Sequence, residues 1–88
     1  MPIRRIYPTP RFKRSFRALP RTIQKRVAQR EGLFGGNPFD PRLDTHQLKG
    51  RLKGLWSYSV DFRYRVLFRF IDGDAVIYYD IGDHSIYR

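Results

Sequence analysis

Two histidines are the side chains best suited to proton transfer in this 88-residue chain. His46 begins the segment HQLKGRLKGLW, and His84 lies near the end of the chain in DIGDHSIYR. Histidine gains and loses a proton near neutral pH, so this pair could act as a general base and a general acid. A single histidine is more often structural or simply exposed, but neither of these two lies in an apolar periodic run.

Arginines in the segment RYRVLFRF, residues 63–70, could bind phosphate. Alternate residues of a strand point to the same side of a sheet, which groups Arg63, Arg65 and Arg69. Guanidinium groups bind phosphate with two parallel hydrogen bonds and stay charged. The same face could instead be the solvated side of a half-buried sheet. The phosphate-binding interpretation is favoured because this face would lie beside a second basic segment.

That second segment, HQLKGRLKGLW, repeats Leu-Lys-Gly and contains two glycines in five residues, which disfavours a helix. We interpret it as a loop and strand entry in which Leu48 and Leu52 anchor to the core while the glycines let the backbone turn. Three cations then remain free to meet phosphate: Lys49, Arg51 and Lys53.

Other common catalytic patterns do not occur in the sequence. It contains no cysteine, no nucleotide-binding glycine loop, no GxSxG motif and no Ser/His/Asp pattern. Two histidines without a spaced set of carboxylates match no standard metal site. We therefore expect chemistry that uses neither a metal nor a cofactor.

The charge of the chain is large and unevenly distributed. The formal net charge is +10, and residues 1–54 carry 14 Lys and Arg against 3 Asp and Glu, whereas residues 55–88 carry 4 against 5. Such a charge attracts polyanions, although it also serves solubility and does not distinguish nucleic acid from an acidic protein or anionic lipid. A mean hydropathy of -0.59 predicts a soluble, cytoplasmic protein with neither a membrane span nor a secretory signal.

The first part of the chain predicts a strand and two helices. Residues 3–7 are compatible with a short strand, and Thr9 followed by Pro10 is typical of a helix N-terminus. Apolar residues then recur at helical spacing up to Pro20, where a second helix begins. GGNPFDP, residues 35–41, ends that helix. The apolar face of this second helix is expected to consist of Ile23, Val27 and Leu33.

The second part of the chain predicts three antiparallel strands. Apolar and polar residues alternate in LWSYSV, residues 55–60, and again in residues 63–70. Asp72-Gly73 indicates a hairpin that leads into AVIYYDI, residues 75–81. The expected fold is a single α+β domain over residues 1–88. Its order is β-α-α-β-β-β, with both helices packed on one face of a four-stranded sheet.

This order of elements, with its motifs, resembles the RelE/ParE superfamily of bacterial type II toxins over nearly the whole chain. The motifs are HQLKGRLKGLWSYSV, YRVLFR, IDGDAVIYYDIG and the terminal HSIYR. In that superfamily, RelE-like members cleave mRNA in the ribosomal A site, and ParE-like members inhibit DNA gyrase. Either branch implies a cognate antitoxin protein as partner, and the nuclease branch also implies the ribosome and mRNA.

The resemblance implies a role for each matched residue. His46 occupies the position where related nucleases place a Glu or His, and would be the general base. Arg65 matches the strand arginine that contacts the scissile phosphate. His84 matches a C-terminal general acid, and Tyr87 matches a terminal aromatic that stacks on a base or assists proton transfer. The basic positions of the loop and strand entry correspond to Lys49 and Lys53.

The presence of all these groups favours a ribosome-dependent mRNA endonuclease of the YoeB/YafQ-like type. Two alternatives remain open. One is a gyrase inhibitor on the same fold, which would need no proton transfer. The other is a basic domain that binds RNA or the ribosome without catalytic activity.

Overall fold

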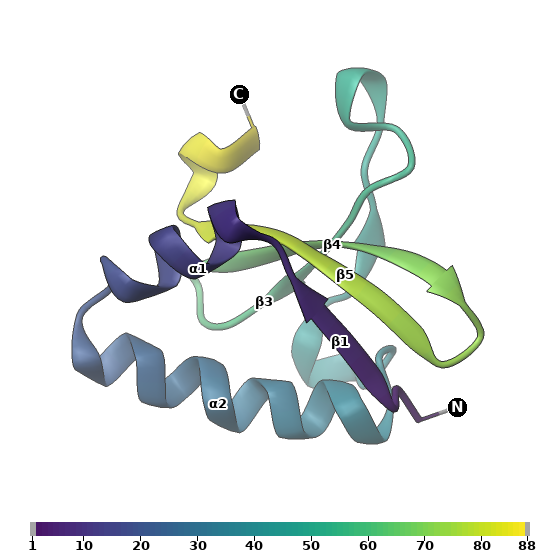
Figure 1. Ribbon diagram of the computed structural model, residues 1–88, viewed down its shortest axis with the longest axis horizontal. Helices are drawn as coiled ribbons and strands as arrows, with labels where there is room; N and C mark the ends of the chain where they lie inside the picture. The colour runs from purple at the N-terminus through teal and green to yellow at the C-terminus, as the bar shows by residue number, and fades with distance from the viewer. Residues whose placement is uncertain (1, 88) are drawn as a thin grey trace.

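The computed structural model describes residues 2–87, and their secondary structure follows the predicted order with short additions. Within this range there are two helices and five strands: β1 (Arg5–Pro8), α1 (Pro10–Arg17), α2 (Arg21–Gly36), β2 (His46–Gln47), β3 (Trp56–Ser59), β4 (Arg65–Asp72) and β5 (Ala75–Gly82). Three short 3-10 turns accompany them: η1 (Pro41–Leu43), η2 (Gly50–Leu52) and η3 (His84–Tyr87). Figure 1 shows α2 below the sheet, whereas η3 and the segment that contains η2 rise above it.

The strands form one mixed sheet in the order β1-β5-β4-β3-β2. β1 runs parallel to β5, and every other neighbouring pair is antiparallel. The sheet therefore has five strands where four were expected. The additional strand is β2, which has only two residues and is polar. A segment this short has no periodicity that sequence analysis could detect.

The predicted start of α1 is confirmed in detail. The Thr9 side chain accepts a hydrogen bond of 3.0 Å from the backbone N–H of Phe12, and Pro10 is the first helical residue. α2 ends at Gly36, within the sequence predicted to stop it. Within residues 2–87, neither helix combines the length and the apolar character needed to cross a bilayer.

The core lies between α2 and the sheet, and Phe34 is its centre on the helix side. This ring is fully buried, stacks on Tyr58 at 4.6 Å and meets Phe68 edge-on at 4.9 Å. The expected apolar line of α2 included Leu33, which is half-buried and packs against the core, but it did not include Phe34. Phe34 lies seven residues after the buried Val27, two helical turns later on the same face.

A β-bulge in β5 changes which of its residues face the core. Phe68 pairs with Tyr78, but Leu67 pairs with Asp80, so Tyr79 is an extra residue on β5. Strict alternation from Tyr78 would turn Asp80 towards the core. The bulge instead places Ile81, the partner of Val66, in the core and turns Asp80 to the opposite face.

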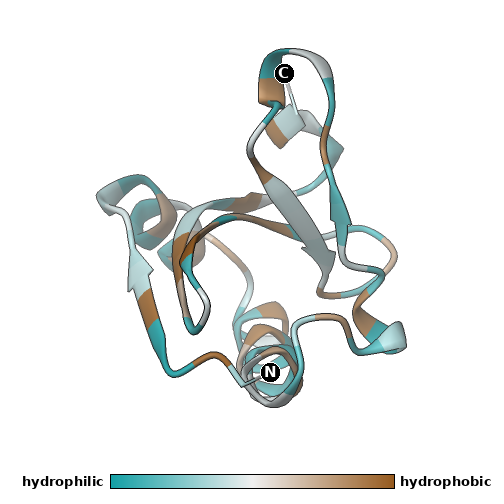
Figure 2. Cartoon of the chain, turned by 90° about the vertical axis from the view of Figure 1, so that its right-hand side faces the viewer, coloured by the Kyte–Doolittle hydropathy of each residue, from teal (hydrophilic) through white to brown (hydrophobic). Residues whose placement is uncertain are grey.

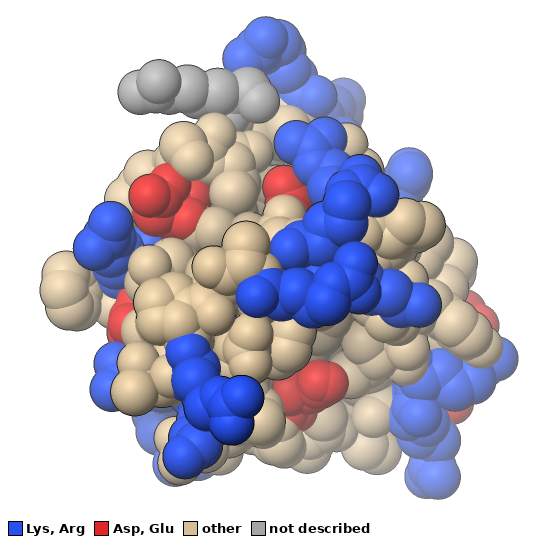
Figure 3. All heavy atoms as spheres, turned by 60° about the vertical axis from the view of Figure 1, so that its left-hand side comes forward, with Lys and Arg blue, Asp and Glu red and all other residues tan. Residues whose placement is uncertain are grey.

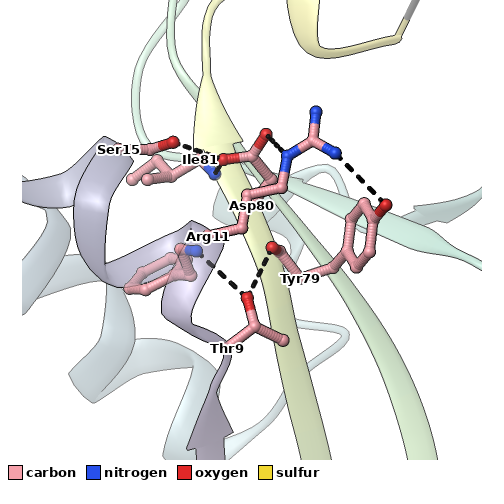
Figure 4. Close-up of polar contacts among 7 residues, drawn as sticks. Thr9, Arg11, Ser15, Tyr79, Asp80 and Ile81 are labelled. Carbon is pink, nitrogen blue, oxygen red and sulfur yellow. Dashed lines mark hydrogen bonds and ion pairs between the residues drawn. The ribbon is translucent and has the colours of Figure 1, made fainter.

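Asp80 is buried and ties α1 to the end of β5, as Figure 4 shows. Its carboxylate accepts hydrogen bonds from Ser15 Oγ at 2.7 Å, Arg11 Nε at 3.0 Å and the backbone N–H of Ile81 at 2.8 Å. A second tie runs from Thr9 Oγ1 to the carbonyl of Tyr79 at 2.8 Å. A buried charge is tolerated here because every face of the carboxylate has a donor.

Two boundaries near β4 differ from the prediction. β4 begins at Arg65, so Arg63 lies outside the strand, in a turn where Asp61 accepts hydrogen bonds from the N–H groups of Arg63 and Tyr64. The predicted hairpin between β4 and β5 forms, but Asp72 pairs with Ala75. Its two loop residues are therefore Gly73 and Asp74 rather than Asp72 and Gly73.

We expect Asp80→Ala to lower the free energy of unfolding by about 3 kcal/mol, because it removes a buried, charge-assisted set of hydrogen bonds. Asp72→Ala is the matched control, since it breaks an exposed ion pair with Arg5 and such pairs contribute little. Urea denaturation of both variants measures the difference. Equal losses of unfolding free energy in the two variants would contradict a stabilising role for the Asp80 hydrogen bonds.

Candidate functional site

One row of residues crosses the sheet on the face that points away from α2. His46 in β2 pairs with Ser57 in β3, Ser57 pairs with Leu67 in β4, and Leu67 pairs with Asp80 in β5. Directly paired residues of neighbouring strands project to the same face, with Cβ atoms about 4.5–5.5 Å apart in antiparallel strands. The sheet register therefore places His46 directly beside Ser57.

The C-terminal turn η3 folds back over this row. Tyr87 Oη and Ser57 Oγ lie 3.1 Å apart and share a hydrogen bond. The side chain of Ile86 occupies the place where a Cβ on Gly82 would lie, so only glycine at residue 82 allows this approach. Ser57 and Leu67 are both buried, although they lie on the face that α2 leaves uncovered.

His46 is held in an orientation that suits a general base. Its Nδ1 lies 2.9 Å from the carbonyl oxygen of Asp44. A carbonyl oxygen can only accept, so Nδ1 carries the hydrogen and, in the neutral ring, Nε2 keeps its lone pair. Asp44 has a φ of 50°, a left-handed conformation that is uncommon outside glycine and that places its carbonyl beside the ring.

His84 begins η3, the turn that also carries Tyr87. Its ring lies edge-on to the ring of Tyr87, with centroids 5.8 Å apart. The side chain of His84 is exposed, so it can meet a ligand. Hydrogen bonds from Ser85 lower the pKa of the neighbouring Asp83, and the positive charges of Arg63 and His84 contribute to the same shift. Asp83 therefore remains charged at neutral pH.

Two of the three predicted strand arginines flank the row. Arg65 and Arg69 lie two residues before and after Leu67 on β4, about 7 Å along the strand in each direction. Arg65 is oriented by hydrogen bonds to Ser59 Oγ and to the carbonyl of Asp61. The Arg69 guanidinium lies 3.7 Å from where a Cβ on Gly54 would be, next to the basic loop.

Arg63, the third predicted arginine, lies outside β4. Its guanidinium lies over the ring of Tyr64, 5.5 Å from the centroid, in the turn before β4. The strand predicted for residues 63–70 is wrong for its first two residues, because the hydrogen bonds of Asp61 fold them into a turn, although Tyr64 packs against the core as expected. The charge of Arg63 contributes to the lowered pKa of Asp83, which precedes the C-terminal turn.

The basic loop between β2 and β3 projects from the same side of the sheet as η3 (Figures 1 and 2). Gly50 and Gly54 have φ angles of 69° and 94°, so both need the left-handed conformation that glycine adopts freely. Leu48 and Leu52 are half-buried and lie outside the core cluster, so the predicted core anchors are wrong. The loop cations are all exposed: Lys49, Arg51 and Lys53.

Known proteins share this architecture. The sequence matches no protein-family model and no curated protein. A chain of the toxin-antitoxin complex RelBE2 from Mycobacterium tuberculosis matches with a TM-score of 0.78 and 23% identity, over 96% of this chain and 100% of that one. The YoeB/ParE toxin from Agrobacterium tumefaciens matches with a TM-score of 0.76 and 15% identity, over 92% of this chain and 99% of that one. This protein has the RelE-type toxin fold.

A third neighbour is a chain of the E. coli DinJ-YafQ toxin-antitoxin complex, with a TM-score of 0.74, 15% identity and 94% of each chain covered. All three likenesses extend over more than nine-tenths of this chain. The resemblance inferred from the sequence motifs is therefore confirmed for the fold. Within residues 2–87, the RelE-type fold brings together no group of three His, Cys, Asp or Glu side chains that could hold a metal ion.

Sequence analysis missed the residues that join the two histidine-bearing segments. Ser57 was interpreted only as the polar partner in an alternating strand, and Leu67 as part of a solvated face. Both are buried, and Ser57 is bonded to Tyr87 of η3. No signal in the sequence states where a short C-terminal segment folds back, so the contact between Tyr87 and Ser57 was not predictable.

We expect Tyr87→Phe to lower the free energy of unfolding by about 1–3 kcal/mol, because it leaves the buried Ser57 hydroxyl without its partner. Ser57→Ala should cost less, since the half-buried phenol of Tyr87 can reach water. A double-mutant cycle by urea denaturation measures the coupling. Additive effects of the two substitutions would contradict a direct bond between the two hydroxyl groups.

A second prediction concerns the position of η3. Gly82→Ala should displace η3, because the new Cβ would collide with Ile86. Gly32→Ala is the control, since nothing lies within 4 Å of a Cβ there and alanine should stabilise α2 by about 0.5–1 kcal/mol. Amide hydrogen exchange at residues 84–87 reports the displacement. Unchanged protection in Gly82→Ala would show that η3 does not depend on this contact.

Proposed function

We propose that this protein is the toxin of a type II toxin-antitoxin pair and acts in the cytoplasm as a ribosome-dependent mRNA endonuclease. The observation that carries the proposal is a chain of contacts: His46 pairs with Ser57, the Ser57 hydroxyl bonds Tyr87, and the Tyr87 ring meets His84, with an arginine on each side of this row along β4. A base, an acid and phosphate-binding cations are the groups that metal-independent RNA cleavage requires. The RelE-type fold fits this role.

The proposed reaction is an internal transesterification. Nε2 of His46 removes the proton from a ribose 2′-OH, and the 2′-oxygen attacks the adjacent phosphorus. Arg65 and Arg69 stabilise the additional negative charge of the five-coordinate phosphorane. His84 donates a proton to the 5′-oxygen as the P–O5′ bond breaks. The products are a 2′,3′-cyclic phosphate, which water can open to a 3′-phosphate, and a new 5′-hydroxyl end.

The distribution of charge supports binding to ribosome and mRNA. The chain carries a net charge of +10, and the helical hairpin, residues 10–36, has eight Lys and Arg against the single Glu31. Figure 3 looks at the side of this hairpin, where Lys and Arg form a band across the surface. The loop after β2 adds further exposed cations near the proposed reaction centre. Such a surface accelerates association with polyanions.

The same surface suits a cognate antitoxin protein. The neighbours include chains from toxin-antitoxin complexes. A partner with an acidic or amphipathic segment would complement the charge of the hairpin or cover the row around Ser57. We propose such an antitoxin as the physiological partner of this chain.

Inhibition of DNA gyrase is the second candidate function, because one neighbour is described as a YoeB/ParE toxin. This activity would need surface contacts but no proton transfer. The two functions therefore differ in their dependence on the histidines. Supercoiling assays with the His46→Ala/His84→Ala double variant distinguish them, since inhibition that survives both substitutions would favour gyrase as the target. A basic domain that binds RNA or the ribosome without cutting would show neither activity.

The decisive test is mRNA cleavage in a translating extract. We expect cuts in register with codons, a loss of rate of about 10²–10⁴-fold in His84→Ala and of about 10²–10³-fold in Arg65→Ala. Arg4→Gln is the control, because it removes one charge from an exposed residue outside the site. Mapping of 5′ ends gives the positions of the cuts, and the amount of each end over time gives the cleavage rate of each protein. Cuts without codon register, or wild-type rates in both site variants, would refute the mechanism.

A further inference from the structure

A cationic hollow lies at the outer edge of β3, beside the proposed reaction centre. Its volume is about 260 Å³, and three arginines from different parts of the chain line it: Arg30 of α2, Arg42 of η1 and Arg65 of β4. Phe62, at the turn between β3 and β4, forms part of its rim. The edge of β3 is open here because β2 pairs only with Trp56 and Ser57.

Ion pairs in the hollow leave two positive charges uncompensated. Arg42 is held by Asp40 through a pair of hydrogen bonds, and this guanidinium lowers the pKa of the Asp40 carboxyl to about 2. Asp61 is likewise paired with Arg26. Among the described residues, Arg30 and Arg65 have no carboxylate partner within 4.0 Å and contact only neutral oxygen atoms. These two guanidinium groups are therefore available to a phosphate.

Phe62 is exposed to an unusual degree for a large apolar side chain, at 88%. The turn that carries it is firmly held, because Val60 N–H donates to the carbonyl of Tyr64 at 2.9 Å and Asp61 accepts two further backbone hydrogen bonds. A rigid turn presents the ring to solvent without a partner in the fold. Exposed aromatic rings beside a cationic groove are the means by which proteins bind single-stranded nucleic acid.

The hollow continues directly from the row around Ser57. Ser59 and Arg65 form the next pair on this face after Ser57 and Leu67, about 7 Å along the strands towards the turn. Arg65 therefore flanks the row around Ser57 and also lines the hollow. A strand of RNA whose scissile phosphate lies at the row would pass its neighbouring nucleotide over Ser59 into the hollow.

We infer that this hollow is a nucleotide-binding subsite for single-stranded RNA, in which Arg30 and Arg65 bind a phosphate beside the cleaved one and Phe62 stacks on a base. The inference rests on the proposed ribonuclease function and extends it, because it assigns substrate contacts to Arg30 and Phe62. RNA is the ligand that fits, since the site combines unpaired guanidinium groups with a free aromatic face.

Binding of RNA, measured separately from cleavage, tests the phosphate contact. The probe is a short oligouridine with 2′-O-methyl groups, which cannot be cut by 2′-OH attack, and fluorescence anisotropy reports its affinity at several salt concentrations. Arg30→Gln should weaken binding and reduce the magnitude of the salt slope by about 0.7, the value for one phosphate of a single strand. Arg4→Gln should leave the slope unchanged. Equal slopes for both variants would overturn the phosphate assignment.

Three substitutions of Phe62 test the stacking contact, and none should unfold the protein because the ring is exposed. Phe62→Leu keeps an apolar side chain without a π face and should weaken binding by roughly tenfold, whereas Phe62→Trp should retain wild-type affinity. Phe62→Ala should match Phe62→Leu. On an oligonucleotide without bases, all four proteins should bind equally. A loss that persists on this abasic probe would overturn the stacking assignment.

Cleavage of mRNA in the extract separates this inference from the proposed function. If the wild-type protein cuts nothing while Arg30 and Phe62 still govern oligouridine binding, the subsite stands and the nuclease proposal fails. If the wild-type protein cuts mRNA but Arg30→Gln and Phe62→Leu bind and cut as it does, the nuclease proposal stands and the subsite is refuted.

Discussion

One extra residue in β5 determines what lies on each face of the sheet. Because Tyr79 is bulged, the inward and outward residues of β5 exchange places between Tyr78 and Ile81. Ile81 enters the core, and Asp80 faces the opposite side, where α1 satisfies its carboxylate. Without the bulge, β5 would bury the Asp80 carboxylate in the aromatic core and expose the Ile81 side chain. Both changes would lower the free energy of unfolding.

The bulge also determines where the chain goes after β5. It brings Gly82 opposite Arg65, at the end of the sheet face that α2 leaves open. From there η3 turns back, with Ile86 against Gly82 and Tyr87 bonded to Ser57. This register therefore places the C-terminal turn that carries His84 on the sheet face where His46 pairs with Ser57. The proposed centre is therefore assembled by backbone pairing across the whole sheet rather than by any local motif.

Electrostatics divide the surface into neutral and cationic parts. Asp61, Asp72, Asp74 and Asp80 are each paired with an arginine, which removes most of the negative charge near the sheet. Arg42 is paired with Asp40, and the other cations of residues 2–87 have no carboxylate of that range within 4.0 Å, so that their mutual repulsion opposes folding. Arg30 and Arg65 have no carboxylate partner among the described residues, and they lie beside the exposed Phe62. This arrangement favours binding of a polyanion, whereas it contributes little to the stability of the fold.

The sequence by itself determined the kinds of element and their order, because the 3.6-residue and two-residue periods of apolar side chains report local geometry. It also identified the capping of α1 by Thr9 and the two histidines of the proposed centre. The bulge at Tyr79, the two-residue β2, the turn that removes Arg63 from β4 and the burial of Ser57 were decided by the tertiary structure alone. Each depends on a pairing between distant segments, and a periodic pattern contains no information about which partner, or which register, a strand will meet.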